Sequence, residues 1–278
     1  MKKALLIADS GGSKTDWCLV DRLGNAHYFT TESYHPHRMT EEWILDQAAF
    51  WKEYTAIYDL EVHFFGAGCL KENNQGVVKE AFAQWHITNV SVSSDLVGAA
   101  YALLGNQDGV IGILGTGSVA AVIRDHKVEQ VLGGYGHLLG DEGSGYSFGK
   151  HLLYNYVHKA FSVDLMRELE KALGTRETIF KEVYGPLGKN YISEISKRTV
   201  HLKEFEEIAL LHQQNIAEFV EQYLVKHPGL TEISFVGSYA FHQQNNLRKV
   251  LEMMGVQLTK VIERPIEQLT EYFVKHTF

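Results

Sequence analysis

The sequence contains little cysteine and no long apolar run, and these shortages exclude several classes of protein. Only Cys18 and Cys69 occur among 278 residues, and neither has the neighbours of a metal-binding or redox motif. No stretch is apolar for long enough to cross a bilayer. The N-terminus enters a predicted strand directly, without the apolar core and cleavage site of a signal peptide. We therefore expect a cytoplasmic protein with no membrane partner.

Positive charge is also scarce. The chain carries 26 Lys and Arg against 34 Asp and Glu, a formal net charge of -8, and no basic cluster. Binding to nucleic acid needs concentrated positive charge against the phosphates, so we expect no nucleic-acid partner. The remaining composition, 45% hydrophobic and 22% charged, is that of an ordinary globular protein, and the chain is long enough for two domains.

The first motif is an apolar strand, a glycine-rich turn and a second strand, over residues 5–20. Adjacent glycines allow backbone N–H groups to approach an anion closely, and hydroxyl and ammonium groups add donors. We therefore expect the turn to bind phosphate through Gly11, Gly12, Ser13, Lys14 and Thr15. Asp9, at the end of the strand, suits Mg²⁺ held through water.

The same turn has two other interpretations. A hairpin that merely needs two glycines is about equally compatible with the residue types. A P-loop is excluded, because Ser13 stands where that motif needs glycine and a strand follows where it needs a helix.

The opening pattern recurs about a hundred residues later. An apolar strand at 110–114 leads into the turn Gly115–Ser118, a return strand at 119–123 and a third strand at 128–132. Strands alternate with helices elsewhere, which indicates an α/β fold, and the recurrence indicates an internal duplication. We predict an N-terminal lobe over 1–105 and a C-terminal lobe over 106–278, with the last helix, about 265–276, able to pack back on the N-terminal lobe.

A helical stripe in the second half is interpreted as core without chemistry. Its members recur at helical spacing: Phe205, Ile208, Ala209, His212, Ile216, Phe219, Val220 and Tyr223.

Five short motifs stand where predicted strands end: Asp9–Thr15, Gly66–Cys69, Ser94–Asp95, Gly115–Ser118 and Gly237–Ser238. Their order resembles the sugar kinase, actin and heat-shock ATPase superfamily over essentially the whole chain. The loop at 134–145, Gly-Tyr-Gly-His-Leu-Leu-Gly-Asp-Glu-Gly-Ser-Gly, is similar to that of N-acetylglucosamine kinases in the BadF/BadG/BcrA/BcrD ATPase family. The resemblance implies two ribonuclease H-like lobes, each a strand-strand-strand-helix-strand-helix unit, with an ATP and sugar cleft between them.

The resemblance also implies roles for individual residues. Asp9 would orient Mg²⁺, and both turns would contact the ATP phosphates, the second through Thr116, Gly117 and Ser118. Gly237 and Ser238 would lie against adenosine. The sugar would be bound by His35, Asp95, Gly134, Tyr135, Gly136 and Asp141.

Asp95 is the predicted catalytic base, because phosphoryl transfer needs a carboxylate to receive the proton of the acceptor hydroxyl. The alternative is that Ser94 and Asp95 only cap the helix that begins at Leu96. The surrounding motifs favour catalysis.

The predicted reaction is phosphorylation of N-acetylglucosamine to its 6-phosphate. Eukaryotic-type enzymes carry Asn at the positions of His35 and Val119, so glucosamine or another sugar stays open as the acceptor. An activator ATPase that holds an iron–sulfur cluster is rejected, since no cysteine follows Cys69. A non-catalytic sugar or nucleotide sensor remains, although the chain has no basic helix pair for DNA. The resemblance also implies a homodimer.

Overall fold

The computed structural model describes residues 1–277 and divides them into two compact units. Unit 1 contains Met1–Asp108, Ile123–Val128 and residues 264–277, and unit 2 contains Gly109–Val122 and Glu129–Glu263. The prediction assigned residues 123–128 to the second lobe, whereas the structure groups them with unit 1. This difference arises because contacts in space, not chain order, define a unit.

Unit 1 contains one sheet and four α-helices. In chain order its elements are β1 (Lys2–Ser10), β2 (Lys14–Asp21), β3 (Ala26–Glu32), the 3-10 turn η1 (Pro36–Arg38), α1 (Glu41–Ile57), β4 (Tyr58–Gly66), α2 (Glu72–Gln84), β5 (Asn89–Ser94), α3 (Asp95–Leu104) and α11 (Ile266–Thr277).

The unit 1 sheet has the order β3-β2-β1-β4-β5. Strands β1, β2 and β3 pair antiparallel, whereas β4 pairs parallel to β1 and β5 parallel to β4. The carboxyl ends of β1, β4 and β5 therefore lie at one edge of the sheet. Asp9, Gly66 and Asp95 stand at that edge, as expected for parallel strands.

Aromatic side chains fill the unit 1 core beneath α1 and α2. Trp17 and Trp51 are fully buried, and their rings meet edge to face with centroids 5.1 Å apart. Their indole nitrogens donate hydrogen bonds to Thr31 Oγ1 (2.9 Å) and Tyr34 Oη (3.1 Å). Both indoles are therefore buried without an unsatisfied donor.

Unit 2 contains the second sheet and the remaining helices. Its elements are β6 (Gly109–Leu114), β7 (Ser118–Arg124), β8 (Lys127–Gly133), α4 (Gly145–Val157), α5 (Val163–Leu173), α6 (Arg176–Val183), α7 (Gly188–Arg198), η2 (Val200–Leu202), α8 (Glu206–Phe219), the π-turn η3 (Val220–Leu224), β9 (Glu232–Val236), α9 (Ser238–His242), α10 (Gln244–Met253) and β10 (Gln257–Ile262). The tip of the β7–β8 hairpin belongs to unit 1.

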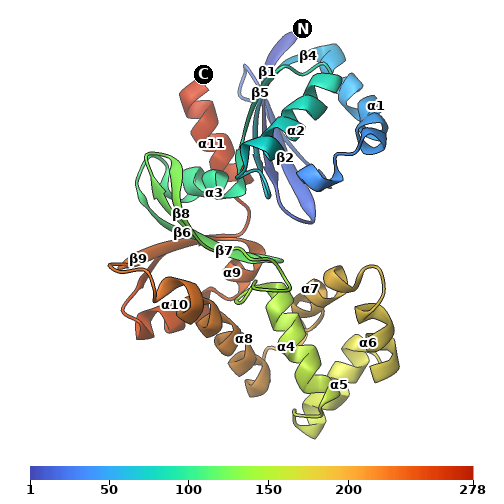
Figure 1. The fold of residues 1–278 in the computed structure, drawn as a ribbon, viewed down its shortest axis with the longest axis vertical. Coiled ribbons are helices and arrows are strands. Elements are labelled where there is room, and N and C mark those ends of the chain that lie inside the picture. Colours follow the sequence, from blue (N-terminus) through green and yellow to red (C-terminus); the bar gives the residue numbers. More distant parts are fainter. Residues whose placement is uncertain (278) are drawn as a thin grey trace. The chain divides into compact units, whose positions relative to one another are not determined.

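The second sheet repeats the first in strand order. It runs β10-β9-β6-β7-β8, so β6, β7 and β8 take the places of β1, β2 and β3, and β9 and β10 those of β4 and β5. The predicted duplication is thereby confirmed. A large helical insertion, α4 to α8, separates β8 from β9 in the second repeat, whereas only η1 and α1 separate β3 from β4 in the first (Figure 1).

A glycine allows close packing within this insertion. Helix α4 lies against α7, and Gly149 of α4 faces the backbone of Ile192 so closely that a Cβ would collide with the Ile192 carbonyl oxygen. Of all the helices within residues 1–277, none is long and apolar enough to cross a membrane.

Gly149→Ala is expected to lower the free energy of unfolding by about 3 kcal/mol, because the added methyl forces the two helices apart. Gly76→Ala is the matched control. Gly76 lies in α2 with open space around it, so alanine there should raise the stability by about 1 kcal/mol through helix propensity. Urea denaturation measures both. Equal stability of the two variants would contradict the packing described.

Candidate functional site

The turn between β1 and β2 presents exposed backbone in unit 1. The Gly11 N–H donates to the Lys14 carbonyl (2.9 Å) and closes the turn, which leaves Gly12 and Ser13 exposed at its tip. The Thr15 hydroxyl, predicted to contact phosphate, points into the unit instead. It is fully buried, bonds to Ser10 Oγ (2.8 Å) and accepts from the Tyr34 N–H (3.0 Å). The Thr15 hydroxyl is therefore left out of the phosphate contacts proposed below.

Asp9 and Asp95 stand at the carboxyl ends of β1 and β5, both half-buried. Burial, followed by the nearby Asp95 and Asp16 carboxylates, raises the pKa of Asp9 to about 7 against the opposing effect of Lys14 and Arg264. Within residues 1–277 no hydrogen bond or ion pair reaches the Asp9 carboxylate. A carboxylate crowded in this way is stabilised by a cation, so Asp9 fits a role beside Mg²⁺.

The Asp95 side chain is not the cap of α3. Ser94 is the N-cap residue, and its hydroxyl accepts from the Val97 N–H (3.4 Å). The Leu96 N–H donates to the Asp95 carboxylate at Oδ1 (3.0 Å). Burial raises the pKa of Asp95 to about 6, although that backbone bond opposes the rise. A carboxylate tuned toward neutral pH is the kind that serves as a general base.

An ion cluster that the sequence did not reveal lies one strand away. Asp16 of β2, the register partner of Asp9, is buried and accepts from Lys14 Nζ (2.8 Å), Arg264 Nη2 (2.6 Å) and Thr30 Oγ1 (2.8 Å). Burial alone would raise the pKa of Asp16, but these hydrogen bonds hold it below its usual value. Lys14, predicted to face phosphate, is thus partly engaged by Asp16.

His35 lies against the turn that follows β4. The left-handed Gly68 (φ 81°) faces the His35 imidazole, whose Nε2 would lie 2.8 Å from a Cβ at that position. Burial raises the pKa of Cys69 to about 12, and the Asp95 charge adds to this effect. Asp9 at the end of β1, Asp95 at the start of α3 and His35 beside the turn after β4 therefore lie at the same edge of the sheet.

In unit 2, Asp141 holds the second predicted phosphate turn. The Ser118 N–H donates to Asp141 Oδ1 (3.1 Å), and a Cβ on Gly117 would lie 3.0 Å from both carboxylate oxygens. The Gly145 and Tyr146 N–H groups at the start of α4 donate to the carbonyls of Gly115 and Thr116. The Ser118 hydroxyl is buried with no partner among residues 1–277, so it has a donor free for an added anion.

Gly237 and Ser238 meet this turn from the neighbouring strand. Gly237 follows β9 directly and has φ 120°, and a Cβ there would collide with the Leu114 carbonyl oxygen at the end of β6. The structure therefore brings together Thr116–Ser118, Asp141 and Gly237–Ser238 within unit 2.

The loop between β8 and α4 carries the remaining predicted sugar residues. Gly134 and Gly136 have positive φ (75° and 77°), and a Cβ on Gly134 would press on Val119 Cγ2. The Tyr135 side chain is 66% exposed. Glu142 accepts from the Tyr223 hydroxyl and lines an open cavity of about 380 Å³ with Glu218, Glu221 and Gln222.

Polar residues of α8 that sequence reasoning missed support this loop. Asn215 is fully buried, accepts from the Gly143 N–H and donates to the Ser144 carbonyl. His212, assigned to the core stripe, is indeed buried but bonds to Tyr239 Oη (2.8 Å) and stacks on Phe148. An Asn three residues after a His on an apolar face was the available signal.

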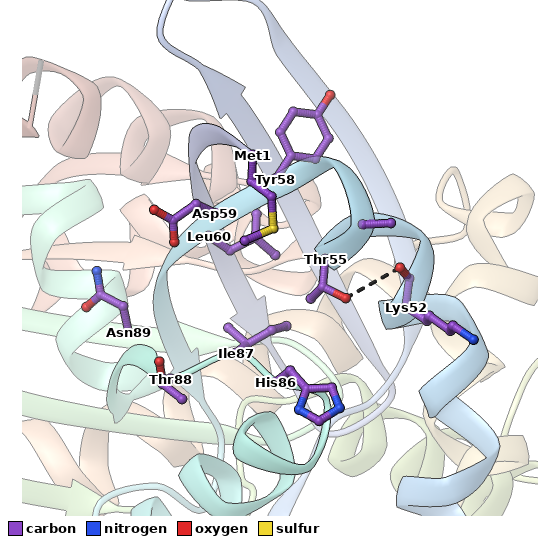
Figure 2. A pocket seen from close by; sticks show the side chains of 11 residues that line it. Met1, Lys52, Thr55, Tyr58, Asp59, Leu60, His86, Ile87, Thr88 and Asn89 are labelled. Carbon is purple, nitrogen blue, oxygen red and sulfur yellow. Dashed lines mark hydrogen bonds between the residues drawn. The ribbon is translucent and has the colours of Figure 1, made fainter.

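A second cavity in unit 1 lies away from these residues. It measures about 370 Å³ and is lined by Tyr58 and Asn89, at the amino ends of β4 and β5, together with Lys52 and His86 (Figure 2). Since Asp9 and Asp95 stand at the carboxyl ends, this cavity does not belong to the candidate site.

The chain is similar to known proteins over almost its whole length. The model of the BadF/BadG/BcrA/BcrD ATPase family matches residues 8–271. A proposed N-acetylglucosamine kinase from Porphyromonas gingivalis is 27% identical, with a TM-score of 0.87 over 99% of this chain and 100% of that one. A search of curated proteins found no match.

Two more distant structures share the fold alone. A proposed N-acetylglucosamine kinase from Chromobacterium violaceum is 15% identical, with a TM-score of 0.69 over 97% of this chain and 98% of its own. A ROK family glucokinase from Streptomyces griseus, in complex with glucose and AMPPNP, is 15% identical, with a TM-score of 0.57 over 97% of both chains. The predicted two-lobe α/β fold is confirmed.

The buried His212 makes stability depend on pH. Burial lowers the pKa of His212 to about 4 from 6.5, so the folded state favours the neutral ring. Its contribution is complete above pH 6.5 and is lost as the pH falls toward 4, which amounts to about 3 kcal/mol. The free-energy difference between wild type and His212→Gln should therefore shrink by about that amount from pH 7.5 to pH 4. Urea denaturation at a series of pH values measures it.

The control is His27→Gln, since His27 is exposed on β3. A His212→Gln difference that stays constant with pH would contradict a buried neutral imidazole.

Proposed function

The chain belongs to the BadF/BadG/BcrA/BcrD ATPase family, and from this premise we propose that it is a sugar kinase. It transfers the γ-phosphoryl group of ATP to a hydroxyl of an amino sugar, with N-acetylglucosamine 6-phosphate as the product. The observation that carries the proposal is Asp95, a half-buried carboxylate at the end of β5 whose pKa is raised to about 6 and which leaves helix capping to Ser94.

Asp95 acts as general base in this proposal. Its pKa of about 6 leaves it ionised at pH 7.5 yet basic enough to accept a proton as the sugar oxygen bonds to phosphorus. Only Oδ1 carries the Leu96 bond, so Oδ2 is the oxygen proposed to take that proton. Phosphoryl transfer asks for little else from the protein than alignment and charge stabilisation.

The ATP phosphates would be bound by the exposed turn at Gly12 and Ser13 and by the turn Thr116–Ser118. The unpartnered Ser118 hydroxyl supports the second assignment, because a buried donor without a partner costs free energy until an acceptor arrives. Lys14 would share its charge between Asp16 and a phosphate. The backbone at Gly237 and Ser238 would contact the adenosine.

Mg²⁺ is the expected metal, and Asp9 is the residue proposed to hold it through water. Bound Mg²⁺ neutralises charge on the phosphates during transfer. A single carboxylate suits this ion, which keeps most of its hydration shell, and the carboxyl environment of Asp9 favours a cation.

The sugar would be bound by His35 and Asp95 on unit 1 and by Gly134, Tyr135, Gly136 and Asp141 on unit 2. Oδ1 of Asp141 already accepts a hydrogen bond from the Ser118 N–H, so we assign Oδ2 to a sugar hydroxyl. A site that pairs buried polar groups with hydroxyls discriminates strongly against sugars that lack them. The P. gingivalis relative, a proposed N-acetylglucosamine kinase, supports this acceptor over glucosamine. A cytoplasmic location and a homodimer stay predictions.

Asp95→Asn is expected to lower kcat by a factor of 10² to 10⁴, since the amide cannot accept the proton. ADP release is measured with ATP and Mg²⁺ across N-acetylglucosamine, glucosamine, N-acetylmannosamine, glucose and no sugar. We expect N-acetylglucosamine to give the highest rate.

Asp59→Asn serves as the control, because Asp59 is exposed at the amino end of β4. Full activity of Asp95→Asn would contradict the assignment of Asp95 as the general base. ATP binding without release of ADP above the sugar-free rate, for every sugar, would favour the sensor over the kinase.

Removing the metal with EDTA should abolish activity, and Asp9→Asn should raise the Mg²⁺ concentration for half-maximal rate about 10- to 100-fold, as losses of outer-shell metal partners do. A titration of rate against Mg²⁺ measures the shift. An unchanged midpoint in Asp9→Asn would contradict the proposal that Asp9 of β1 holds the metal.

A further inference from the structure

A buried polar chain in unit 2 joins two segments to which the proposed function gives different ligands. Asn215 of α8 is fully buried and uses both ends of its amide. Its Oδ1 accepts from the Gly143 N–H (3.2 Å), and its Nδ2 donates to the Ser144 carbonyl (3.0 Å) and to Tyr239 Oη (2.9 Å). One side chain thus touches both the loop before α4 and the helix α9.

The loop end of this chain leads to the proposed sugar and phosphate contacts. Gly143 has φ 76° and packs directly on Phe219, where a Cβ would collide, so the loop backbone has little freedom. Asp141, two residues before it, holds the Ser118 N–H. A shift of the Gly143 backbone would therefore shift both the Asp141 carboxylate and the turn that Asp141 supports.

The other end leads to the proposed adenosine contact. Tyr239 follows Ser238 directly in α9, and its side chain is 5% exposed. Burial raises the pKa of Tyr239, so its hydroxyl stays protonated. Because that oxygen accepts from Asn215, its own proton is available to the His212 Nδ1 at 2.8 Å. His212 is in turn held by stacking on Phe148, with ring centroids 3.8 Å apart.

Such a network resists partial rearrangement. Each broken bond would leave a buried donor or acceptor unpaired, which is costly where water cannot replace the partner. The Asn215 amide therefore follows Tyr239 when α9 moves, and the Gly143 and Ser144 backbone follows Asn215.

We infer that Asn215 and Tyr239 are positioning residues that couple nucleotide binding at Gly237 and Ser238 to the order of the Asp141–Ser144 loop. The inference rests on the proposed function for the identity of the two ligands. Adenosine bound against α9 restricts the motion of Tyr239. Through their hydrogen bonds, Tyr239 then restricts the motion of Asn215, and Asn215 that of the loop. The loop is then ordered to accept the sugar, so the two substrates favour each other's binding.

Hydrogen exchange with adenosine as the probe tests the coupling without requiring turnover. Adenosine lacks phosphates, so it does not engage the Thr116–Ser118 turn directly. In wild type, saturating adenosine should slow amide exchange in the segment 141–146 at least 5-fold. In Tyr239→Phe, which removes only the hydroxyl, the slowing should fall below 2-fold. Asn215→Ser should behave in the same way.

Gln214→Ala is the matched control, since Gln214 is the exposed neighbour on α8. It should keep the wild-type slowing. Equal slowing in wild type and Tyr239→Phe would overturn the inference, and so would wild-type exchange that adenosine leaves unchanged.

A kinetic measurement separates positioning from a merely structural role. With the sugar that wild type phosphorylates, Tyr239→Phe should raise the KM for sugar at least 5-fold at saturating ATP while kcat changes less than 2-fold. A structural defect would instead lower kcat with the folded fraction. A wild type that phosphorylates no sugar contradicts the proposed function, whereas the exchange experiment decides the coupling independently.

Discussion

The bond between the Asp141 carboxylate and the Ser118 N–H is the interaction on which the unit 2 site depends. A buried carboxylate must find donors, and here it finds one in the backbone of a glycine-rich turn. Gly117 is small enough to lie against both carboxylate oxygens. The turn, the loop before α4 and the end of β9 therefore form one interlocked assembly, and the Asn215 amide extends it to α9.

The candidate site of unit 1 is dominated by three neighbouring carboxylates, Asp9, Asp16 and Asp95. The Asp16 and Asp95 carboxylates oppose the ionisation of Asp9. Of these three carboxylates, Asp16 is the one that forms ion pairs within residues 1–277, with Lys14 and Arg264. Asp9 and Asp95 keep raised pKa values of about 7 and about 6. Two of the three carboxylates are therefore poorly stabilised in their ionised form. Such groups are suited to binding a cation and to accepting a proton during a reaction.

Local patterns in the sequence were sufficient for much of this. Periodicity and glycine positions indicated both sheets and their repetition, and the strand orders confirm the duplication. The predicted family and two-lobe fold are confirmed by the family match and the P. gingivalis structure. Ser94 is the N-cap residue of α3, and the Asp95 carboxylate accepts from the adjacent Leu96 N–H through Oδ1, so Oδ2 is left for the proposed catalytic role. The ligand contacts of the candidate residues stay proposals.

By itself the sequence determined which residues end the strands, since an apolar run followed by Gly, Ser or Asp is a local signal. Tertiary structure alone decided which polar atoms form hydrogen bonds or ion pairs inside the fold. Thr15 is turned inward to Ser10 and Tyr34, Arg264 meets Asp16 across 248 positions, and Asn215 reaches Gly143 across 72. Such pairings depend on where distant segments pack, and no local spacing encodes them, because the hydrogen bond of a buried group is selected only once water is excluded.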